Sequence, residues 1–180
     1  YPDRPPVSPP FSLTDYVCGI YAAMSAAIAL YYRDAKNGAG QEIDLSLYEG
    51  IFRMFEFLVA EYDKNGVIRE RKPFMSGSSS PSGTYQTKDG KWVVLVTSTD
   101  RTFVHLAKAM GREDMLEDER FNINAARLKN HNLVDQIVGE WMSRYDYAEV
   151  KAILDKAGVP VNLINSIKDI FEDPHYWARE

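Results

Sequence analysis

The carboxylate of Asp15 is at a position where it could take part in catalysis. Asp15 comes directly after Thr14 and just ahead of an apolar, alanine-rich stretch, Val17 to Tyr32. An acidic residue at the start of a helix can be a cap that accepts hydrogen bonds from free backbone N–H groups. The same position suits a nucleophile, because the positive end of the helix dipole favours an ionised carboxylate. Spacing alone leaves both interpretations open.

A second candidate is the polar segment from Gly77 to Gly83, "GSSSPSG", which includes Ser78. Small residues allow backbone N–H groups to come close to negative charge that develops on an oxygen atom. The segment is therefore a candidate substrate loop, with Gly77, Ser78 and Gly83 as its site residues. A flexible surface loop is the competing interpretation.

Metal and redox chemistry find little support in the sequence. Cys18 is the single cysteine and lies inside the apolar stretch, so we expect it in the core, in a chain from a reducing compartment. The three histidines, His105, His131 and His175, are scattered and form no HExxH motif. We expect no metal site and no permanently bound cofactor. P-loop, GxSxG and dinucleotide-binding signatures are absent from the sequence.

The composition is that of an ordinary globular protein, with 45% hydrophobic and 26% charged residues in 180. The net charge of −5 argues against nucleic acid as a partner. The apolar stretch from Val17 to Tyr32 is shorter than the ~20 residues of a bilayer span, so we expect a buried helix and no membrane association. The first residues lack the order of a signal peptide, and we expect a cytoplasmic protein.

Helices must position the first candidate. The pattern predicts a helix from Ser12 or Thr14 to Asp34, with Ser12 and Asp15 spaced as in a capping box. Gly38 and Gly40 are expected to supply positive φ values in the turn that follows. "QEIDLSL" is a strand candidate. A second helix is predicted from Ser46, with Glu49 at capping-box spacing, to the "DKNG" that ends at Gly66.

An α+β unit is predicted for the rest of the chain. Residues 67–84 are expected to form a loop, followed by a hairpin from Tyr85 to Ser98 that turns at Asp89-Gly90. Tyr85 and Trp92 are expected in the core. Further predictions are helices over 100–110, 123–145 and 146–157, a strand at "VPVNLI" and a short helix at "SIKDIFED".

Several segments, taken in order, resemble the family III CoA-transferases. They are "YYRDAKNGAGQEIDLSLYEG" behind Asp15 and Gly19, "PSGTYQTKDGKWVVL", "ERFNINAARLKNHNLV" with Arg127 and Asn130, and "AGVPVNLINSIKDIFEDPHYWARE". The resemblance covers nearly the whole chain. It implies an α+β fold, within the α/β fold of the family. Residues 1–65 would be helices of the large domain, and residues 66–180 a small α+β domain with a return segment.

The resemblance also implies a reaction. In the family the catalytic aspartate precedes the alanine-rich helix, which is the position of Asp15. The chain would then belong to an enzyme that moves CoA from an acyl-CoA donor to a carboxylic acid through mixed anhydrides and an aspartyl-CoA thioester. Coenzyme A would be a substrate. In relatives a glycine-rich loop covers the aspartate, whereas here serines separate Gly77 from Gly83.

Two alternatives remain open. An α-methylacyl-CoA racemase would use the same aspartate as a base, and a non-enzymatic piece would act only in folding or dimerisation. The family forms interlocked homodimers and has a Rossmann-like half ahead of the aspartate. The resemblance thus implies a C-terminal portion, and we expect this piece alone to be inactive and prone to association.

Overall fold

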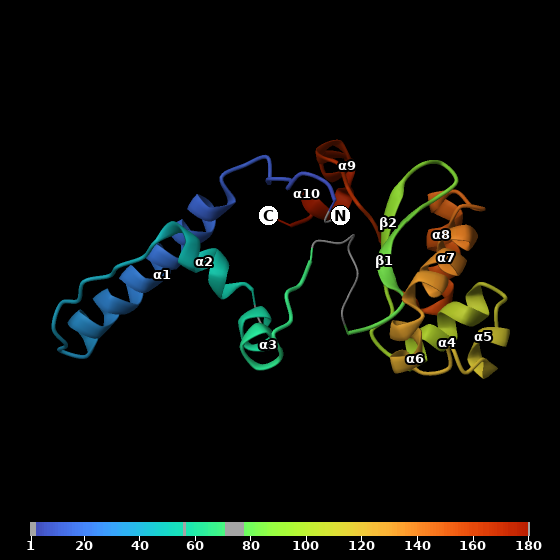
Figure 1. The fold of residues 1–180 in the computed structure, drawn as a ribbon. Coiled ribbons are helices and arrows are strands. Elements are labelled where there is room, and N and C mark those ends of the chain that lie inside the picture. The colour runs from blue at the N-terminus through green and yellow to red at the C-terminus, as the bar shows by residue number, and fades with distance from the viewer. Residues whose placement is uncertain (1–2, 56, 71–77, 180) are drawn as a thin grey trace. The chain divides into compact units, whose positions relative to one another are not determined.

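The computed structural model describes residues 3–55, 57–70 and 78–179 (Figure 1). The chain divides into two compact units, residues 1–71 and 72–180. The boundary predicted from the sequence, between residues 65 and 66, lies at the end of a helix in the first unit. The assignment of the two parts to a large and a small domain stays a prediction.

The first unit contains the helices α1 (Leu13–Ala35), α2 (Leu47–Arg53) and α3 (Leu58–Asn65). The long predicted helix is confirmed as α1, which packs on α2 through Val17 and Cys18. The Cys18 thiol is buried and donates a hydrogen bond to the Leu47 carbonyl oxygen at 2.9 Å. The core position predicted for this cysteine is confirmed.

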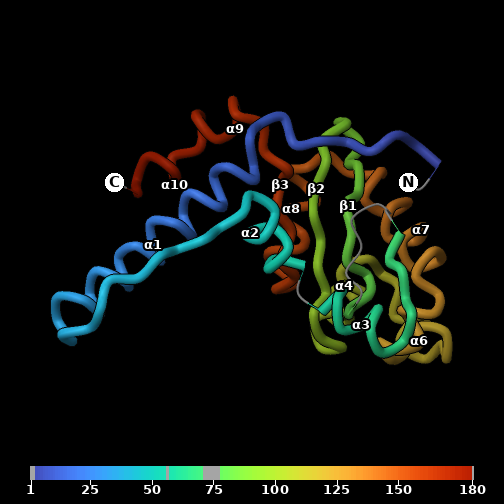
Figure 2. The backbone as a smooth tube through the Cα atoms, turned by 60° about the vertical axis from the view of Figure 1, so that its left-hand side comes forward, coloured from blue at the N-terminus to red at the C-terminus, as the bar shows by residue number. Residues whose placement is uncertain are grey.

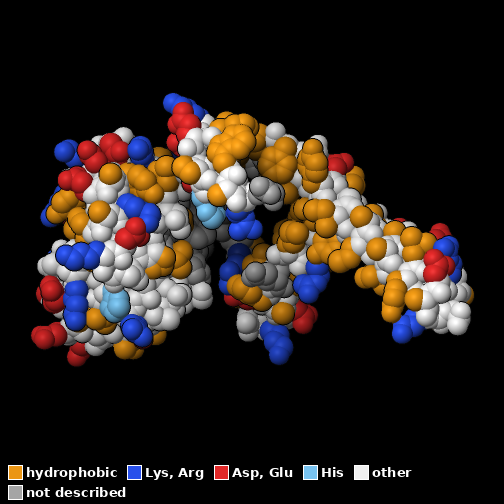
Figure 3. All heavy atoms as spheres, turned by 180° about the vertical axis from the view of Figure 1, so that it is seen from behind, with side chains coloured by type: hydrophobic (Ala, Val, Ile, Leu, Met, Phe, Trp, Pro, Cys, Tyr) orange, Lys and Arg blue, Asp and Glu red, His pale blue; other side chains and the backbone are white. Residues whose placement is uncertain are grey.

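Most of α1 is exposed within this unit. Only Val17 and Cys18 are buried among its residues, so the predicted buried helix is not found here. Exposed apolar side chains recur every fourth residue along it, at Tyr16, Ile20 and Met24, and Figure 3 shows hydrophobic side chains over α1. Among the described residues, α1 is the one helix long and apolar enough to span a bilayer, a test that core helices of globular proteins also pass.

Further predictions for the first unit are also wrong. "QEIDLSL" forms no strand but leads without regular structure into α2. The helix predicted from Ser46 to Gly66 is two helices, because the backbone between them tightens to bonds over three residues, such as Phe55 N–H to the Phe52 carbonyl oxygen at 3.1 Å. Positive φ after α1 belongs to Asn37, at 53°.

Gly38 is required for a different reason than its φ. A Cβ atom there would lie 2.1 Å from Cε1 of Tyr32, so the turn closes against the tyrosine ring only with glycine. The Gly38 N–H donates to the Tyr32 carbonyl oxygen at 3.1 Å. Gly66, in contrast, ends α3 with the left-handed φ of 65° that was predicted for a helix stop.

The second unit is built on a three-stranded antiparallel sheet in the order β1-β2-β3, whose strands run side by side in Figure 2. β1 (Ser82–Gln86) and β2 (Trp92–Val96) form the predicted hairpin, and β3 (Val161–Leu163) is the predicted "VPVNLI" strand. Gly90 makes the turn with φ of 77°, and its N–H donates to the Thr87 carbonyl oxygen at 2.9 Å.

Helices α4 (Asp100–Ala109), α5 (Asp114–Glu117), α6 (Asn124–Lys129), α7 (His131–Met142) and α8 (Tyr147–Ala157) lie on one side of the sheet (Figure 1). β3 then leads to α9 (Ile167–Glu172) and α10 (Pro174–Trp177). The predicted helices over 100–110 and 146–157 and the "SIKDIFED" helix are confirmed. α5 and α10 were not predicted.

The helix predicted over 123–145 is in fact α6 and α7. Asn130 interrupts it with φ of −106° and ψ of 24°, and its side-chain amide donates to the Ala126 carbonyl oxygen at 3.0 Å. The Asn130 backbone N–H donates to the same carbonyl oxygen at 3.1 Å, so both donors of Asn130 bind the last turn of α6.

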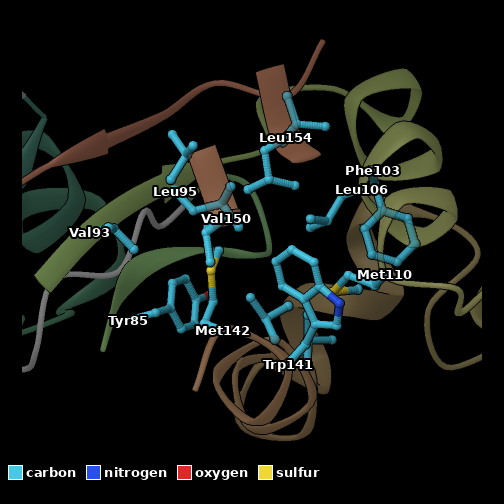
Figure 4. Packing of buried hydrophobic residues seen from close by; sticks show 14 of the residues in the cluster. Tyr85, Val93, Leu95, Phe103, Leu106, Met110, Trp141, Met142, Val150 and Leu154 are labelled. Carbon is cyan, nitrogen blue, oxygen red and sulfur yellow. The ribbon is translucent and has the colours of Figure 1, made fainter. Parts of the chain in front are cut away.

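The core of this unit lies between the sheet and the helices, as Figure 4 shows. The strands contribute Tyr85, Val93 and Leu95, and α4, α7 and α8 contribute residues such as Leu106, Trp141 and Val150. Tyr85 is in the core as predicted, at 5% exposure. The same prediction for Trp92 is wrong, because its side chain is 50% exposed. Successive strand residues face opposite sides, so Val93 and Leu95 point inward and Trp92 does not.

Candidate functional site

Asp15 is the third residue of α1 and is exposed. Its carboxylate accepts a hydrogen bond from the Thr14 hydroxyl at 3.3 Å. The first backbone N–H groups of a helix have no partners within that helix, and they attract negative charge. The carboxylate therefore combines access from solvent with an electrostatic setting that suits an anion.

The capping box predicted between Ser12 and Asp15 is not formed. Ser12 has φ of −74° and ψ of 68° and makes no side-chain cap hydrogen bond. Capping boxes with the same spacing do form at three other helices. There Glu49, Glu149 and Asp169 accept a hydrogen bond from the backbone N–H of the residue that precedes the helix, at 3.0, 3.0 and 2.7 Å. Asp15 thus has cap spacing without cap geometry, which leaves its carboxylate available for another role.

The second predicted site is only partly a loop. Gly77 lies outside the described residues. Ser78 is exposed, and its carbonyl oxygen accepts from the Asn124 side chain at 2.8 Å. Gly83 is buried inside β1, opposite Leu95, so the loop predicted up to Thr84 ends earlier and Gly83 is a strand residue. Asp15 belongs to the first unit, and Ser78 and Gly83 belong to the second.

Asn124 and Arg127 of α6 form hydrogen bonds with the backbone of residues Ser78 to Ser80, which we call the serine segment. The Asn124 side chain accepts the Ser80 N–H at 3.1 Å, besides its bond to Ser78. Arg127 is fully buried, and its Nε donates to the Ser80 carbonyl oxygen at 2.6 Å. The backbone from Ser78 to Ser80 is thus fixed by two side chains one helical turn apart.

The Arg127 guanidinium is also well satisfied elsewhere. Nη1 donates to the Phe121 carbonyl oxygen at 2.8 Å, Nη2 pairs with Asp100 at 2.6 Å, and the group stacks 4.0 Å from the centre of the Phe103 ring. The planar group of an arginine suits such a site because its donors have fixed directions. Sequence reasoning gave Arg127 no separate role. Its signals in the sequence were its place in a segment that resembles the family and a charge between Ala126 and Leu128.

A second polar pair lies under the sheet. The Tyr85 hydroxyl donates to the Asp135 carboxylate at 2.6 Å. Burial, followed by this bond to Asp135, raises the pKa of Tyr85 far above its ordinary range. Burial also raises the pKa of Asp135, although the bond from Tyr85 opposes that change. We interpret the pair as structural. Across the described ranges, no three His, Cys, Asp or Glu side chains are placed to hold a metal ion.

Comparison with solved structures defines the class of fold. A CaiB/BaiF family protein from Brucella suis, 29% identical, matches 99% of this chain and 47% of its own, with a TM-score of 0.79. A hypothetical protein from Mycobacterium tuberculosis, 19% identical, has the same fold with a TM-score of 0.84 over 100% of this chain and 47% of its own.

The family follows from the sequence comparison. The family described as CoA-transferase family III matches residues 1–180, and the chain belongs to this family. Succinyl-CoA–D-citramalate CoA-transferase of Chloroflexus aurantiacus is 34% identical over all of this chain and 44% of its own length. Succinate–glutarate CoA-transferase of Agrobacterium fabrum is 28% identical over 99% of this chain and 44% of its own. The chain spans less than half the length of these relatives.

Proposed function

We propose that the protein containing this chain is a CoA-transferase, which moves CoA from an acyl-CoA donor to a carboxylic acid. Family membership and the names of the relatives support this activity. Coenzyme A enters as a thioester substrate and is not a permanently bound cofactor. Relatives at 34–36% identity are named for succinyl-CoA as donor and for citramalate or malate as acceptor. Succinyl-CoA with a hydroxylated dicarboxylic acid is therefore the first substrate pair to test.

Asp15 is proposed as the nucleophile. Its carboxylate attacks the thioester carbonyl, the C–S bond breaks, and a mixed anhydride and CoA thiolate form. The thiolate then attacks the Asp15 carbonyl, which releases the donor acid and leaves an aspartyl-CoA thioester. The acceptor carboxylate attacks this thioester and frees the thiolate again. Attack of the thiolate on the acceptor carbonyl gives the new acyl-CoA and restores Asp15.

The geometry of α1 carries this assignment. Asp15 has the spacing of a capping residue but is not bound to Ser12, and it is exposed at the positive end of a long helix. A carboxylate used for stability would be expected to close the box, as Glu49 does with Ser46. The first step needs a carboxylate that is accessible and not held in a helix cap.

The test is covalent trapping on the full-length protein. After incubation with succinyl-CoA, intact mass should show a CoA adduct, and hydroxylamine should convert Asp15 to a hydroxamate found by peptide mapping. Asp15→Ala should abolish both the adduct and the transfer. The matched control is Asp34→Ala, because Asp34 is at the opposite end of α1 and pairs with Arg33 at 2.6 Å. An adduct that persists in Asp15→Ala would refute the assignment. No adduct, with exchange of the α-proton of a 2-methylacyl-CoA in deuterated water, would identify a racemase.

We also propose that the full-length protein is a cytoplasmic homodimer, interlocked as in the family that the sequence resembles. The exposed apolar side chains every fourth residue of α1 support extensive burial of this helix in the complete assembly. Light scattering at several concentrations measures the state. A mass of one subunit throughout would contradict the proposal.

A further inference from the structure

An open pocket of about 540 Å³ lies between α4 and α8 in the second unit. This volume is in the range of small-molecule sites. α4 contributes the first three lining residues and α8 the other three: His105, Lys108, Ala109, Ile153, Lys156 and Ala157. No role in CoA transfer has been assigned to any of them.

The charge of this pocket is one-sided. It is lined by two lysines and a histidine and by no carboxylate, although the whole chain has a net charge of −5. Within the described part of the chain, Lys108 and Lys156 make no ion pair, whereas Lys151 of the same helix α8 pairs with Asp155. Each lysine lies in the last turn of its helix, where the helix dipole favours a cation. The dipole does not explain why both line one pocket without a counter-charge.

His105 joins the two helices at this pocket. Its Nδ1 lies 2.9 Å from the Ala157 carbonyl oxygen. A carbonyl oxygen can only accept, so Nδ1 carries the proton and donates. The bond fixes α4 to the end of α8, and with it the helix turns that bear Lys108 and Lys156. The two cations are therefore presented by a fixed backbone.

We propose that this pocket binds the phosphoryl group of a small organic phosphate monoester. Each lysine offers three N–H donors and a full positive charge, which suits the several oxygens and the double negative charge of a phosphate monoester better than a single carboxylate. Ala109, Ile153 and Ala157 provide an apolar wall for the organic part. The pocket belongs to the second unit and Asp15 to the first, and this proposal does not depend on the transferase chemistry proposed for Asp15.

The test follows the methyl signal of Ile153 by NMR in the full-length protein with labelled isoleucine methyl groups. Phenyl phosphate, inorganic phosphate and acetate are titrated at matched ionic strength. We expect a saturable shift of Ile153 with phenyl phosphate, a weaker affinity for inorganic phosphate, and none with acetate. Ile137 of α7, which packs against the core of this unit, should not move. Lys108→Met with Lys156→Met should weaken binding about tenfold or more.

Lys151→Met is the matched control, since it removes one positive charge from α8 outside this pocket. It should leave the affinity within about twofold, as expected for a charge acting through screened solvent. An equal loss in this variant, or a shift that does not saturate, would mean general attraction and would overturn the proposal. Acetate binding as tightly as phenyl phosphate would refute phosphoryl selectivity. Inorganic phosphate binding as tightly as the ester would refute a role for the organic part.

Discussion

Arg127 donates from Nε to the carbonyl oxygen of Ser80 at 2.6 Å, and this bond joins a helix to a segment 47 residues earlier in the chain. The guanidinium is fully buried. Its Nη1 and Nη2 atoms donate to the Phe121 carbonyl oxygen and the Asp100 carboxylate. One side chain thus fixes the approach to β1, the start of α4 and the loop before α6.

Replacement of this group should destabilise the chain strongly. Arg127→Met leaves the Ser80 and Phe121 carbonyl groups buried without their donor, and we expect a loss of roughly 3 kcal/mol in the free energy of unfolding. Little of it comes from Asp100, whose side chain is 58% exposed. Urea denaturation measures the change. The control is Arg120→Met, whose partly exposed pair with Asp118 should contribute at most about 1 kcal/mol; similar losses in both variants would contradict the buried role.

The contact between α1 and α2 depends on Gly50. A Cβ atom there would lie 3.0 Å from Cys18 Sγ and 3.2 Å from Val17 Cγ1, closer than well-packed atoms approach. Gly50→Ala should therefore cost roughly 1–3 kcal/mol through overpacking, which exceeds the roughly 0.5–1 kcal/mol that alanine gains inside α2. Gly19→Ala is the control, because nothing lies within 4 Å of that position and the helix gains about 0.5–1 kcal/mol from alanine. Thermal melts of the 180-residue chain distinguish the two, and a stabilising Gly50→Ala would refute the tight contact.

Stability at alkaline pH should depend on Tyr85. Its pKa in the folded state is raised, so the folded chain keeps the hydroxyl proton at pH values where the unfolded chain loses it. The stabilisation is complete below the ordinary tyrosine pKa of about 10 and is lost as the pH rises above it. Denaturation at successive pH values should show a smaller alkaline loss for Tyr85→Phe than for the original chain. Tyr48→Phe, at an exposed position, should keep the original profile; an unchanged profile in Tyr85→Phe would contradict the prediction.

The serine segment should matter for turnover if it contributes to the proposed transferase site. Asn124→Ala removes the side chain that binds both Ser78 and Ser80. Displacement of a positioned backbone by about 1 Å can lower a rate by two orders of magnitude, and we expect a fall in kcat of at least about tenfold with the fold intact. Steady-state kinetics and circular dichroism check both parts. Asn122→Ala, at an exposed neighbour, should retain full activity; unchanged kcat in Asn124→Ala would exclude the segment from the site.

The sequence predicted the fold best at positions where a single residue type determines the backbone angles. Gly90, Gly66 and Gly158 all have the positive φ that their turns or helix ends require. Periodicity was less reliable, because the apolar pattern continues through positions where hydrogen bonds change partner. Asn130 divides one predicted helix with a side-chain hydrogen bond that no pattern shows. The helix predicted from Ser46 divides instead where backbone bonds over three residues replace the α-helical ones.

The candidate site was only partly accessible from sequence. Asp15 could be identified by resemblance, but its lack of a bond to Ser12 is a matter of backbone angles. Asn124 and Arg127 bind serines that lie more than 40 positions earlier in the chain. No local sequence rule predicts contacts between residues so far apart. Gly83 was assigned to a loop because it ends a polar, glycine- and serine-rich segment, whereas its pairing with Leu95 makes it part of the strand.

Because Cys18 is buried between α1 and α2, its reactivity can be used to measure how often these two helices separate. The thiol is covered by α2 and bonded to Leu47, so a thiol reagent can reach it only when α1 and α2 separate. At high reagent concentration, the rate of alkylation becomes the rate at which the helix pair opens. Cys18 is the single cysteine among the 180 residues. The increase in the mass of the chain, followed over time, therefore gives the rate of opening without an introduced label.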